Sequence, residues 1–411
     1  MNDLIEIPAG NEPLPSLVEM PIAELAPIYF DPPSHYWVED SRGDWIKLGE
    51  TNVIRRLKAA GLRGRRILDE AISEAEMRLI EIQRDCDVAY AGPLAGHFKG
   101  LHEICGKRVL VTESPKLIEP FRGKWPTIAK LLKNLLHTAE ADQRPYLIGW
   151  LKVALESLRS GVWRPGQALV LAGPRDCGKS LLQKLVTEAL GGRVGKPYRY
   201  MTGGSDFNGE LFGSEHLTIE DELSSRYANA RRAFGASIKQ FTVNEVQSLH
   251  AKGKQALSMV PLWRLTISVN DEPENLLILP PLDDSIGDKL HLLKCNRKPM
   301  PMPTETAADR KAFWQTLIAE MPAFLYHVEN RPIAEELRCG RFGIKTYHHP
   351  DISAAIDELA PEMQLLTFAS TPPTEVLEST RRPARLLSWK APLSQTPGLS
   401  PTRRSCSRLT M

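Results

Sequence analysis

The chain has 411 residues and a formal net charge of +2, with 42% hydrophobic and 25% charged residues. These values are ordinary for a globular protein of two or three domains. No apolar run approaches the roughly 18 residues of a membrane-spanning helix, and the six cysteines have no CxxC spacing that would predict a zinc site. The N-terminus lacks a secretory pattern, so we expect a cytoplasmic protein without membrane contacts.

Composition and the spacing of hydrophobic residues divide the chain into six predicted segments. In chain order they are an irregular N-terminal arm (1–28), a small α+β module (29–110), a helical linker or collar (111–165), an α/β domain (166–300), a helical C-terminal region (301–366) and a disordered basic tail rich in Ser, Thr and Pro (367–411).

Within residues 29–110, alternating residues around the turn Ser41–Asp44 predict a hairpin. A short helix is expected from an N-cap at Thr51 to a stop at Gly61, and a longer one over 69–84. A basic run follows the hairpin and suits either a DNA-loading surface or a solvated helix face: Arg55, Arg56, Lys58, Arg63, Arg65 and Arg66. The hairpin aromatics suit either base stacking or core packing: Tyr36, Trp37 and Trp45.

The strongest local pattern is GPRDCGKS at 173–180, which matches G-x-x-x-x-G-K-[ST] between a β-like run (167–172) and a helical run (181–190). Glycines let backbone amides surround phosphate oxygens, and a helix N-terminus favours negative charge. Lys179 would reach the β- and γ-phosphates, and the Ser180 hydroxyl would ligate Mg²⁺. The predicted ATP-binding residues are Gly173, Pro174, Arg175, Asp176, Cys177, Gly178, Lys179, Ser180 and Leu181.

A P-loop also needs acidic residues to hold the metal and to orient water. The strand-like run HLTIEDE at 216–222 ends in three carboxylates. We predict Asp221 as the metal ligand beside Ser180, and Glu222 as the residue that polarises the attacking water. Glu220 with Asp221 is the alternative register. A later strand-like run ends at Asn270, whose amide is expected to bond the γ-phosphate or the attacking water.

The order of P-loop, acidic strand, lysine-bearing segment and strand-Asn resembles superfamily-3 helicases, a branch of the AAA+ ATPases. The closer resemblance, carried by GQALVLAGPRDCGKS, LTIEDE and LTISVNDEPENL, is to the phage- and plasmid-type primase–helicase ATPases, which are often prophage proteins. It implies an α/β fold: a P-loop AAA+ core with a parallel sheet flanked by helices. It also implies an ATP hydrolase, a DNA helicase or translocase for replication of a phage, prophage or plasmid, and a hexameric ring of identical subunits.

The resemblance also assigns residues by position. In that family a hairpin between the acidic and sensor strands grips single-stranded DNA, and the matching segment carries His250, Lys252 and Lys254. A solvated Lys-Gly-Lys turn is the alternative. Relatives place an arginine against the neighbour's ATP, a position for which Lys289 and Arg297 are the candidates here. No clustered carboxylates of a primase are visible, so a separate primase or replication-origin protein is an expected partner.

Two other functions stay open at this point. One is a non-helicase P-loop ATPase switch, such as a loader or a phage-defence module. The other is a truncated, inactive remnant, because relatives often continue into a winged-helix-like domain where this chain passes into its basic tail.

Overall fold

The computed structural model describes residues 26–67, 71–220 and 228–358. Most of the predicted arm, the whole predicted tail, and the carboxylates Asp221 and Glu222 lie outside the described residues. Among the described residues, no helix is long and apolar enough to span a membrane.

The first strands form an antiparallel sheet in the order β1 (Ile28–Asp31), β2 (His35–Glu39) and β3 (Trp45–Gly49). The pairing of β2 with β3 confirms the predicted hairpin. Tyr36 is fully buried in a small core with Val53 and Leu57. Its ring is therefore a packing residue, and the base-stacking alternative is wrong for it.

The two helices that follow differ from their predicted bounds. Helix α1 (Glu50–Ala59) starts before Thr51, because Gly49 is its N-cap. Helix α2 (Glu74–Asp85) starts later than residue 69. Ser73 forms a capping box there, since its hydroxyl accepts from the Glu76 N–H while the Glu76 carboxylate accepts from the Ser73 N–H.

A second small sheet has the order β4-β6-β5 and precedes the helical segment. The bounds of these elements are β4 Tyr90–Gly92, β5 Gly100–Ile104, β6 Lys107–Val111, α3 Pro126–Leu136 and α4 Arg144–Ser160. Both helices fall where the sequence predicts them.

The main sheet has five parallel strands in the order β13-β7-β12-β9-β8. Its strands are β7 Ala168–Ala172, β8 Val194–Gly195, β9 His216–Glu220, β12 Arg264–Val269 and β13 Leu290–Lys294. The helices between them are α5 Lys179–Ala189, α6 Tyr198–Met201, α7 Ala228–Val243 and α8 Pro273–Leu276. Strands β7, β9 and β12 fall within the β-like runs predicted at 167–172, at 216–222 and before Asn270, and they are neighbours in one sheet.

The remaining elements are the hairpin β10 (Gln247–Leu249) with β11 (Leu257–Met259), the long helix α9 (Ala307–Asn330), the short pair β14 (Arg338–Cys339) with β15 (Gly343–Ile344), and α10 (Pro350–Glu358). Helix α9 starts with a capping box between Thr306 and Asp309.

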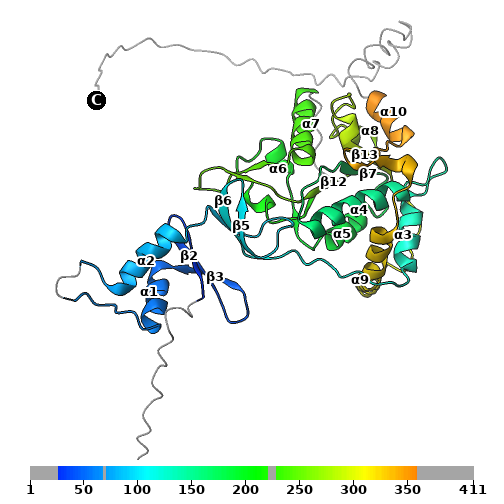
Figure 1. Ribbon diagram of the computed structural model, residues 1–411. Coiled ribbons are helices and arrows are strands. Elements are labelled where there is room, and N and C mark those ends of the chain that lie inside the picture. The colour runs from blue at the N-terminus through cyan, green and yellow to red at the C-terminus, as the bar shows by residue number, and fades with distance from the viewer. Residues whose placement is uncertain (1–25, 68–70, 221–227, 359–411) are drawn as a thin grey trace, which may run out of the picture. The chain divides into compact units, whose positions relative to one another are not determined.

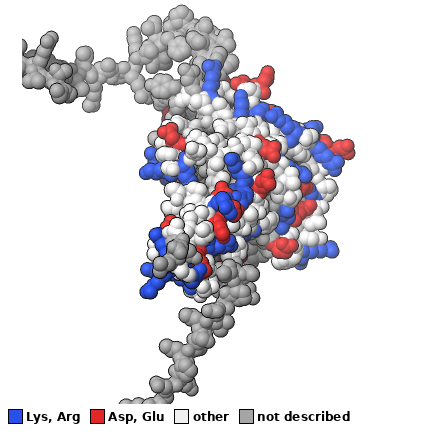
Figure 2. Space-filling model, turned by 60° about the vertical axis from the view of Figure 1, so that its left-hand side comes forward, with Lys and Arg blue, Asp and Glu red and all other residues white. Residues whose placement is uncertain are grey.

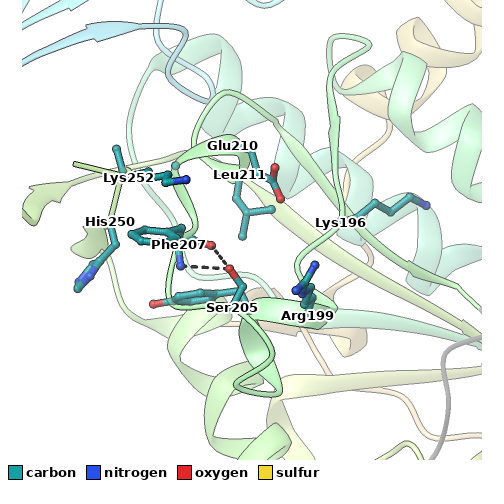
Figure 3. Close-up of a pocket in the computed structure, with 11 residues that line it drawn as sticks. Lys196, Arg199, Ser205, Phe207, Glu210, Leu211, His250 and Lys252 are labelled. Carbon is teal, nitrogen blue, oxygen red and sulfur yellow. Dashed lines mark hydrogen bonds between the residues drawn. The ribbon is translucent and has the colours of Figure 1, made fainter. Parts of the chain in front are cut away.

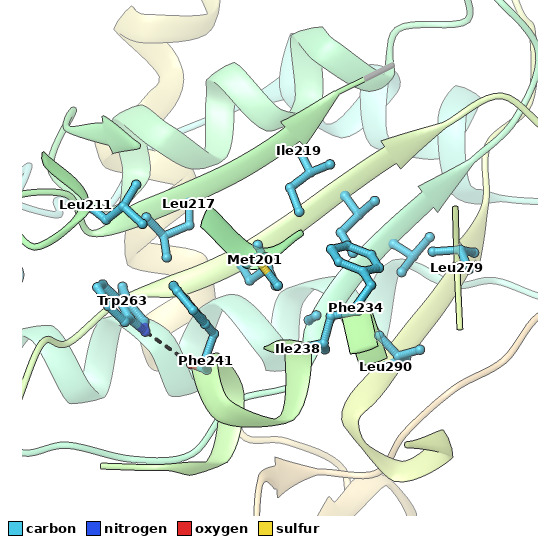
Figure 4. Close-up of a cluster of buried hydrophobic side chains, with 14 of the residues drawn as sticks. Met201, Leu211, Leu217, Ile219, Phe234, Ile238, Phe241, Trp263, Leu279 and Leu290 are labelled. Atoms are coloured by element: carbon cyan, nitrogen blue, oxygen red, sulfur yellow. Dashed lines mark hydrogen bonds between the residues drawn. The ribbon is translucent and has the colours of Figure 1, made fainter. Parts of the chain in front are cut away.

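Both faces of the main sheet are covered, which explains why β7 is apolar without alternation. Ala168, Val170 and Ala172 face one core cluster, and Leu169 and Leu171 face the other. The first cluster includes Phe241 of α7, stacked on Trp263 with ring centroids 5.1 Å apart (Figure 4). The second includes side chains of α3, α4, α5 and α9, so helices flank the sheet on both sides (Figure 1).

Candidate functional site

The topology places a site at the carboxyl end of β7. From β7 the chain crosses to the β8 edge, returns through β9 and β12, and then adds β13 on the other side of β7. In parallel sheets, ligands bind outside the carboxyl ends of the strands where the strand order reverses. The loop 173–178 leaves β7 at this point.

The loop backbone is held in conformations that its glycines allow. Gly178 has φ 111°, a value that side chains rarely adopt, and it directly precedes the first residue of α5. A Cβ on Gly173 would lie 2.4 Å from the carbonyl oxygen of Cys295. This loop therefore passes close to the end of β13, and α5 presents its N-terminus to the cavity beside it.

Lys179 joins the loop to Asn270, which directly follows β12. Its side chain is buried, and its Nζ donates to the carbonyl oxygens of Gly173 (2.7 Å) and Pro174 (2.8 Å) and to Asn270 Oδ1 (2.9 Å). Lys179 and Asn270 are 91 positions apart in the sequence, yet the pairing of β7 with β12 brings them together. A phosphate would replace carbonyl oxygens as the acceptor of this ammonium.

The cavity at the loop has a volume of about 600 Å³, within the range of small-molecule sites. Its lining consists of Arg175, Asp176, Cys177, Gly178, Lys179, Ser180, Leu181, Asn270 and Met300. Seven of these are predicted ATP-binding residues. Met300 could not be predicted as a lining residue, because only the course of the chain after β13 brings it to the loop.

The residues present fit a nucleoside triphosphate with Mg²⁺. Ser180 is exposed in the first turn of α5, where backbone N–H groups have no intrahelical acceptor. Glu220 ends β9 beside Ser268 of β12, two residues before Asn270. The described residues contain no cluster of three or more His, Cys, Asp or Glu that would hold a metal alone. A bound Mg²⁺ would therefore depend on Ser180, phosphate oxygens and the predicted carboxylates.

Two thiols meet at the loop. Cys177 and Cys295 are both buried in the cluster that contains β7 and α5. The hydrogen bond from the Cys295 thiol and the nearby Lys179 charge lower the pKa of Cys177, while the same pairing and burial raise the pKa of Cys295. Cys177 thus has the more acidic thiol, and its Sγ lies 4.0 Å from Lys179 Nζ.

A second cavity, of about 450 Å³, lies between the β10–β11 hairpin and the segment after β8 (Figure 3). Its lining includes three basic side chains, Lys196, Arg199 and Lys252, and the aromatic ring of Phe207, which is 51% exposed. His250 also contributes to it. Cations beside an exposed ring are the chemistry of a single-stranded nucleic acid site. We call this cavity the basic–aromatic pocket.

The side chain of Asn208 bonds the β10–β11 hairpin beside this pocket. The Asn208 side chain donates to the Ser248 carbonyl (2.9 Å) and accepts from the His250 N–H (2.7 Å). Two of the three predicted DNA-binding residues, His250 and Lys252, line the pocket. The third, Lys254, does not, and its Nζ lies 2.5 Å from Asp31 Oδ1. Lys254 is thus engaged by a carboxylate.

Sequence reasoning missed Lys196, Arg199 and Phe207. A signal was available, since Lys196–Tyr200 interleaves basic and aromatic residues, which is typical of nucleic-acid contacts. Lys196 Nζ also lies 2.6 Å from Glu220 Oε1, so one side chain connects the basic–aromatic pocket with the end of the acidic strand.

The two predicted trans-acting cations do not line the cavity at the loop of their own chain. Lys289 is mostly buried at the amino end of β13, and its ammonium contacts the Asp288 carboxylate. Arg297 is exposed, three residues beyond the carboxyl end of β13.

On the face that Figure 2 shows, acidic and basic side chains are intermixed. This agrees with the small net charge, so electrostatic attraction of DNA would depend on local sites such as the basic–aromatic pocket.

Comparison with known proteins identifies the fold. No family model matches the chain, and no curated protein is similar to it at a significant level. Among solved structures, the apo structure of the NrS-1 C terminal region superimposes with a TM-score of 0.55 at 14% identity, over 83% of this chain and 74% of that one. A JCV helicase structure (TM-score 0.29, 14% identity, 60% of this chain and 68% of that one) and the SCCmec type IV Cch active helicase (0.29, 9%, 69% and 54%) match much less well. The chain therefore has a mixed α/β fold with a five-stranded parallel sheet and a P-loop-like core, shared with the NrS-1 region.

Proposed function

We propose that this chain is an ATP-dependent DNA helicase or translocase of the superfamily-3 type, built on an AAA+ core, that serves replication of a phage, prophage or plasmid. The observation that carries the proposal is the contact of Lys179 with Asn270, which joins a P-loop to a polar sensor residue on the neighbouring strand. The basic–aromatic pocket supplies the second requirement, a place for a nucleic-acid strand.

In this proposal the backbone of 173–180 holds the phosphates, and the Lys179 ammonium neutralises their charge. Ser180 and Asp221 hold Mg²⁺, which supplies Lewis-acid stabilisation of the transferred phosphoryl group when bound. Glu222, or Glu220 in the alternative register, takes the proton of the attacking water. Asn270 orients that water or the γ-phosphate.

The strand would lie along the basic–aromatic pocket. Lys252, Arg199 and Lys196 would contact backbone phosphates, and the ring of Phe207 would stack on a base. The pairing of Lys196 with Glu220 offers a direct link between strand binding and the nucleotide site. Lys254 would join only after leaving Asp31.

The chain would act as a homo-oligomeric ring, proposed to be hexameric, in which Lys289 or Arg297 completes the site of the next subunit. Both lie away from the nucleotide cavity of their own chain, as a trans-acting residue must. The expected partners are single-stranded DNA and a separate primase or replication-origin protein.

The test measures ATP hydrolysis with and without single-stranded DNA, strand displacement, and native mass with ATP. We expect DNA to stimulate hydrolysis, Lys179→Ala to abolish it, and Phe207→Ala with Lys252→Ala to remove only the stimulation. Phe121→Ala with Lys116→Ala is the matched control, because these residues lie outside both cavities. Hydrolysis without strand displacement would instead favour an ATPase switch, and a monomer that binds ATP without hydrolysis would favour an inactive remnant.

A further inference from the structure

The two buried thiols beside the phosphate loop are not used by the proposed reaction. Cys177 lies within the loop, two residues before Lys179, and Cys295 directly follows β13. The Cys295 N–H donates to the Ala172 carbonyl (2.7 Å), which fixes Cys295 against the end of the strand that leads into the loop. The two side chains are hydrogen-bonded to each other within one buried cluster, so the residues are neighbours although 118 positions separate them in the sequence.

Cys295 also lies against the start of the loop, and both cysteines are buried. A Cβ on Gly173 would lie 2.8 Å from the Cys295 Cβ, so the loop and the residue after β13 are in direct contact. Both thiols are at most 2% exposed. Cys177 lines the cavity at the loop, however, which is the side from which a small reagent would approach it.

We propose that Cys177 and Cys295 form a reversible thiol–disulfide site that closes the nucleotide cavity when a peroxide oxidises it. The consequence for nucleotide binding rests on the proposed function, whereas the formation of the link does not.

The chemistry divides between the two residues. The hydrogen bond from Cys295 and the charge of Lys179 favour the thiolate of Cys177, which is the nucleophilic form. Its sulfur attacks one peroxide oxygen: the S–O bond forms, the O–O bond breaks, and hydroxide leaves, which gives a sulfenic acid. The Cys295 sulfur then attacks the Cys177 sulfur, the S–S bond forms, and the S–O bond breaks. The departing hydroxide takes the Cys295 proton as water, so two thiols lose two hydrogens while one peroxide becomes two waters.

The link would immobilise the loop against β13. Disulfide geometry requires the two sulfurs to be about 2.05 Å apart, so the loop must move toward Cys295, and with it the backbone next to Lys179. A shift of about 1 Å in a positioning group can cost about 100-fold in rate. Oxidation is therefore expected to remove ATP hydrolysis and to weaken ATP binding by about tenfold or more.

The test uses the full chain, reduced and free of nucleotide, then treated with hydrogen peroxide. Remaining thiols are alkylated, linked peptides are mapped by mass spectrometry, and ATP binding is measured by calorimetry before and after dithiothreitol. We expect a Cys177–Cys295 link, loss of ATP binding, and recovery on reduction. Cys295→Ala and Cys295→Ser should bind ATP when reduced, form no link, and keep more ATP binding after peroxide than the wild type, while the exposed-cysteine control Cys105→Ala should behave as wild type.

The outcomes separate the two proposals. Absence of the link in the wild type overturns the thiol site, and so does a link that leaves ATP binding unchanged in a protein that binds ATP. Equal peroxide sensitivity of Cys295→Ala also overturns it. A link that forms in a protein that fails to bind ATP when reduced supports the thiol site and overturns the nucleotide proposal.

Discussion

Three oxygen atoms surround the Lys179 ammonium, two from the loop backbone and one from Asn270. Because the side chain is buried, this ammonium needs such partners to compensate for its lost hydration. The loop carbonyls hold the charge next to the place where phosphates would lie. The same geometry explains why the glycines at 173 and 178 matter, since any side chain there would meet Cys295 or Met300.

At the residue scale, we predict that Asn270→Ala lowers the rate of ATP hydrolysis while ATP still binds. Removal of one group aimed at developing charge costs about 100-fold or more in rate. Steady-state phosphate release and calorimetry with ATP measure the two effects. Asn275→Ala is the control, because Asn275 is an exposed amide on α8 whose side chain donates to Glu272. An unchanged hydrolysis rate in Asn270→Ala would remove Asn270 from the site.

At the element scale, a buried side chain bonds the β10–β11 hairpin, whose Leu249 and Met259 are also buried in the main core cluster. Asn208 is 4% exposed and bonds the hairpin at both Ser248 and His250. The hairpin itself pairs only three residues per strand, and an isolated two-stranded hairpin is marginally stable. Asn208 therefore helps to hold the loop of the hairpin next to the segment that carries Phe207.

We predict that Asn208→Ala loosens the hairpin, with a cost of about 1–3 kcal/mol from the buried groups left without partners. Hydrogen exchange of the β10 and β11 amides should accelerate, and affinity for single-stranded DNA should fall while ATP binding stays. Asn208→Asp keeps the acceptor for the His250 N–H and should be milder. Asn244→Ala, just before β10, is the matched control, and equal exchange in it and in Asn208→Ala would contradict this assignment.

At the scale of the whole molecule, two buried histidines connect stability to pH. Burial lowers the pKa of His216 and of His291 to about 3. Their ordinary pKa is about 6.5, so between these values the unfolded chain binds protons that the folded chain does not. The free energy of unfolding is therefore greatest above pH 6.5 and falls as the pH decreases toward 3.

Urea unfolding at pH 7.5 and pH 5 tests this expectation. The midpoint should be lower at pH 5, and the difference should shrink in His291→Gln. Exposed His250→Gln should keep the wild-type difference. Exposed carboxylates such as Asp40 and Glu74 have lowered pKa values. They stay ionised between pH 7.5 and pH 5, so they do not produce the difference between the two midpoints. A midpoint that is the same at both pH values would contradict the buried neutral state.

The proposed ring gives a second prediction for the whole molecule. Lys179→Ala and Arg297→Ala should each be inactive, one in its own site and the other in its neighbour's. Mixed rings contain interfaces where an intact Lys179 meets an intact Arg297, so mixing should restore part of the hydrolysis rate. Lys289→Ala in place of Arg297→Ala decides between the two cations. No recovery with either variant would exclude both from a trans-acting role.

Much of the fold followed from local patterns. Short apolar runs predicted the strands β7 and β9. The helical spacing of apolar residues after Gly178 predicted α5. Helix starts were less well predicted, since α2 begins at a capping box formed by Ser73 and Glu76. Tyr36 likewise had two possible roles until burial identified it as a core residue.

By itself, the sequence determined the strand, glycine-containing loop and helix at 167–190, because the eight residues of the loop motif are contiguous and the strand and helix that position them are adjacent in the chain. Only the tertiary structure decided what surrounds the loop. Asn270, Cys295 and Met300 reach it because β12 and β13 pair on either side of β7. The basic–aromatic pocket arises in the same way, from two segments that Asn208 joins. The spacing of apolar residues, which predicts a helix or a strand, can be read from neighbouring residues. The order of strands in the sheet depends on burial between residues that are far apart in the sequence, which no short stretch of sequence contains.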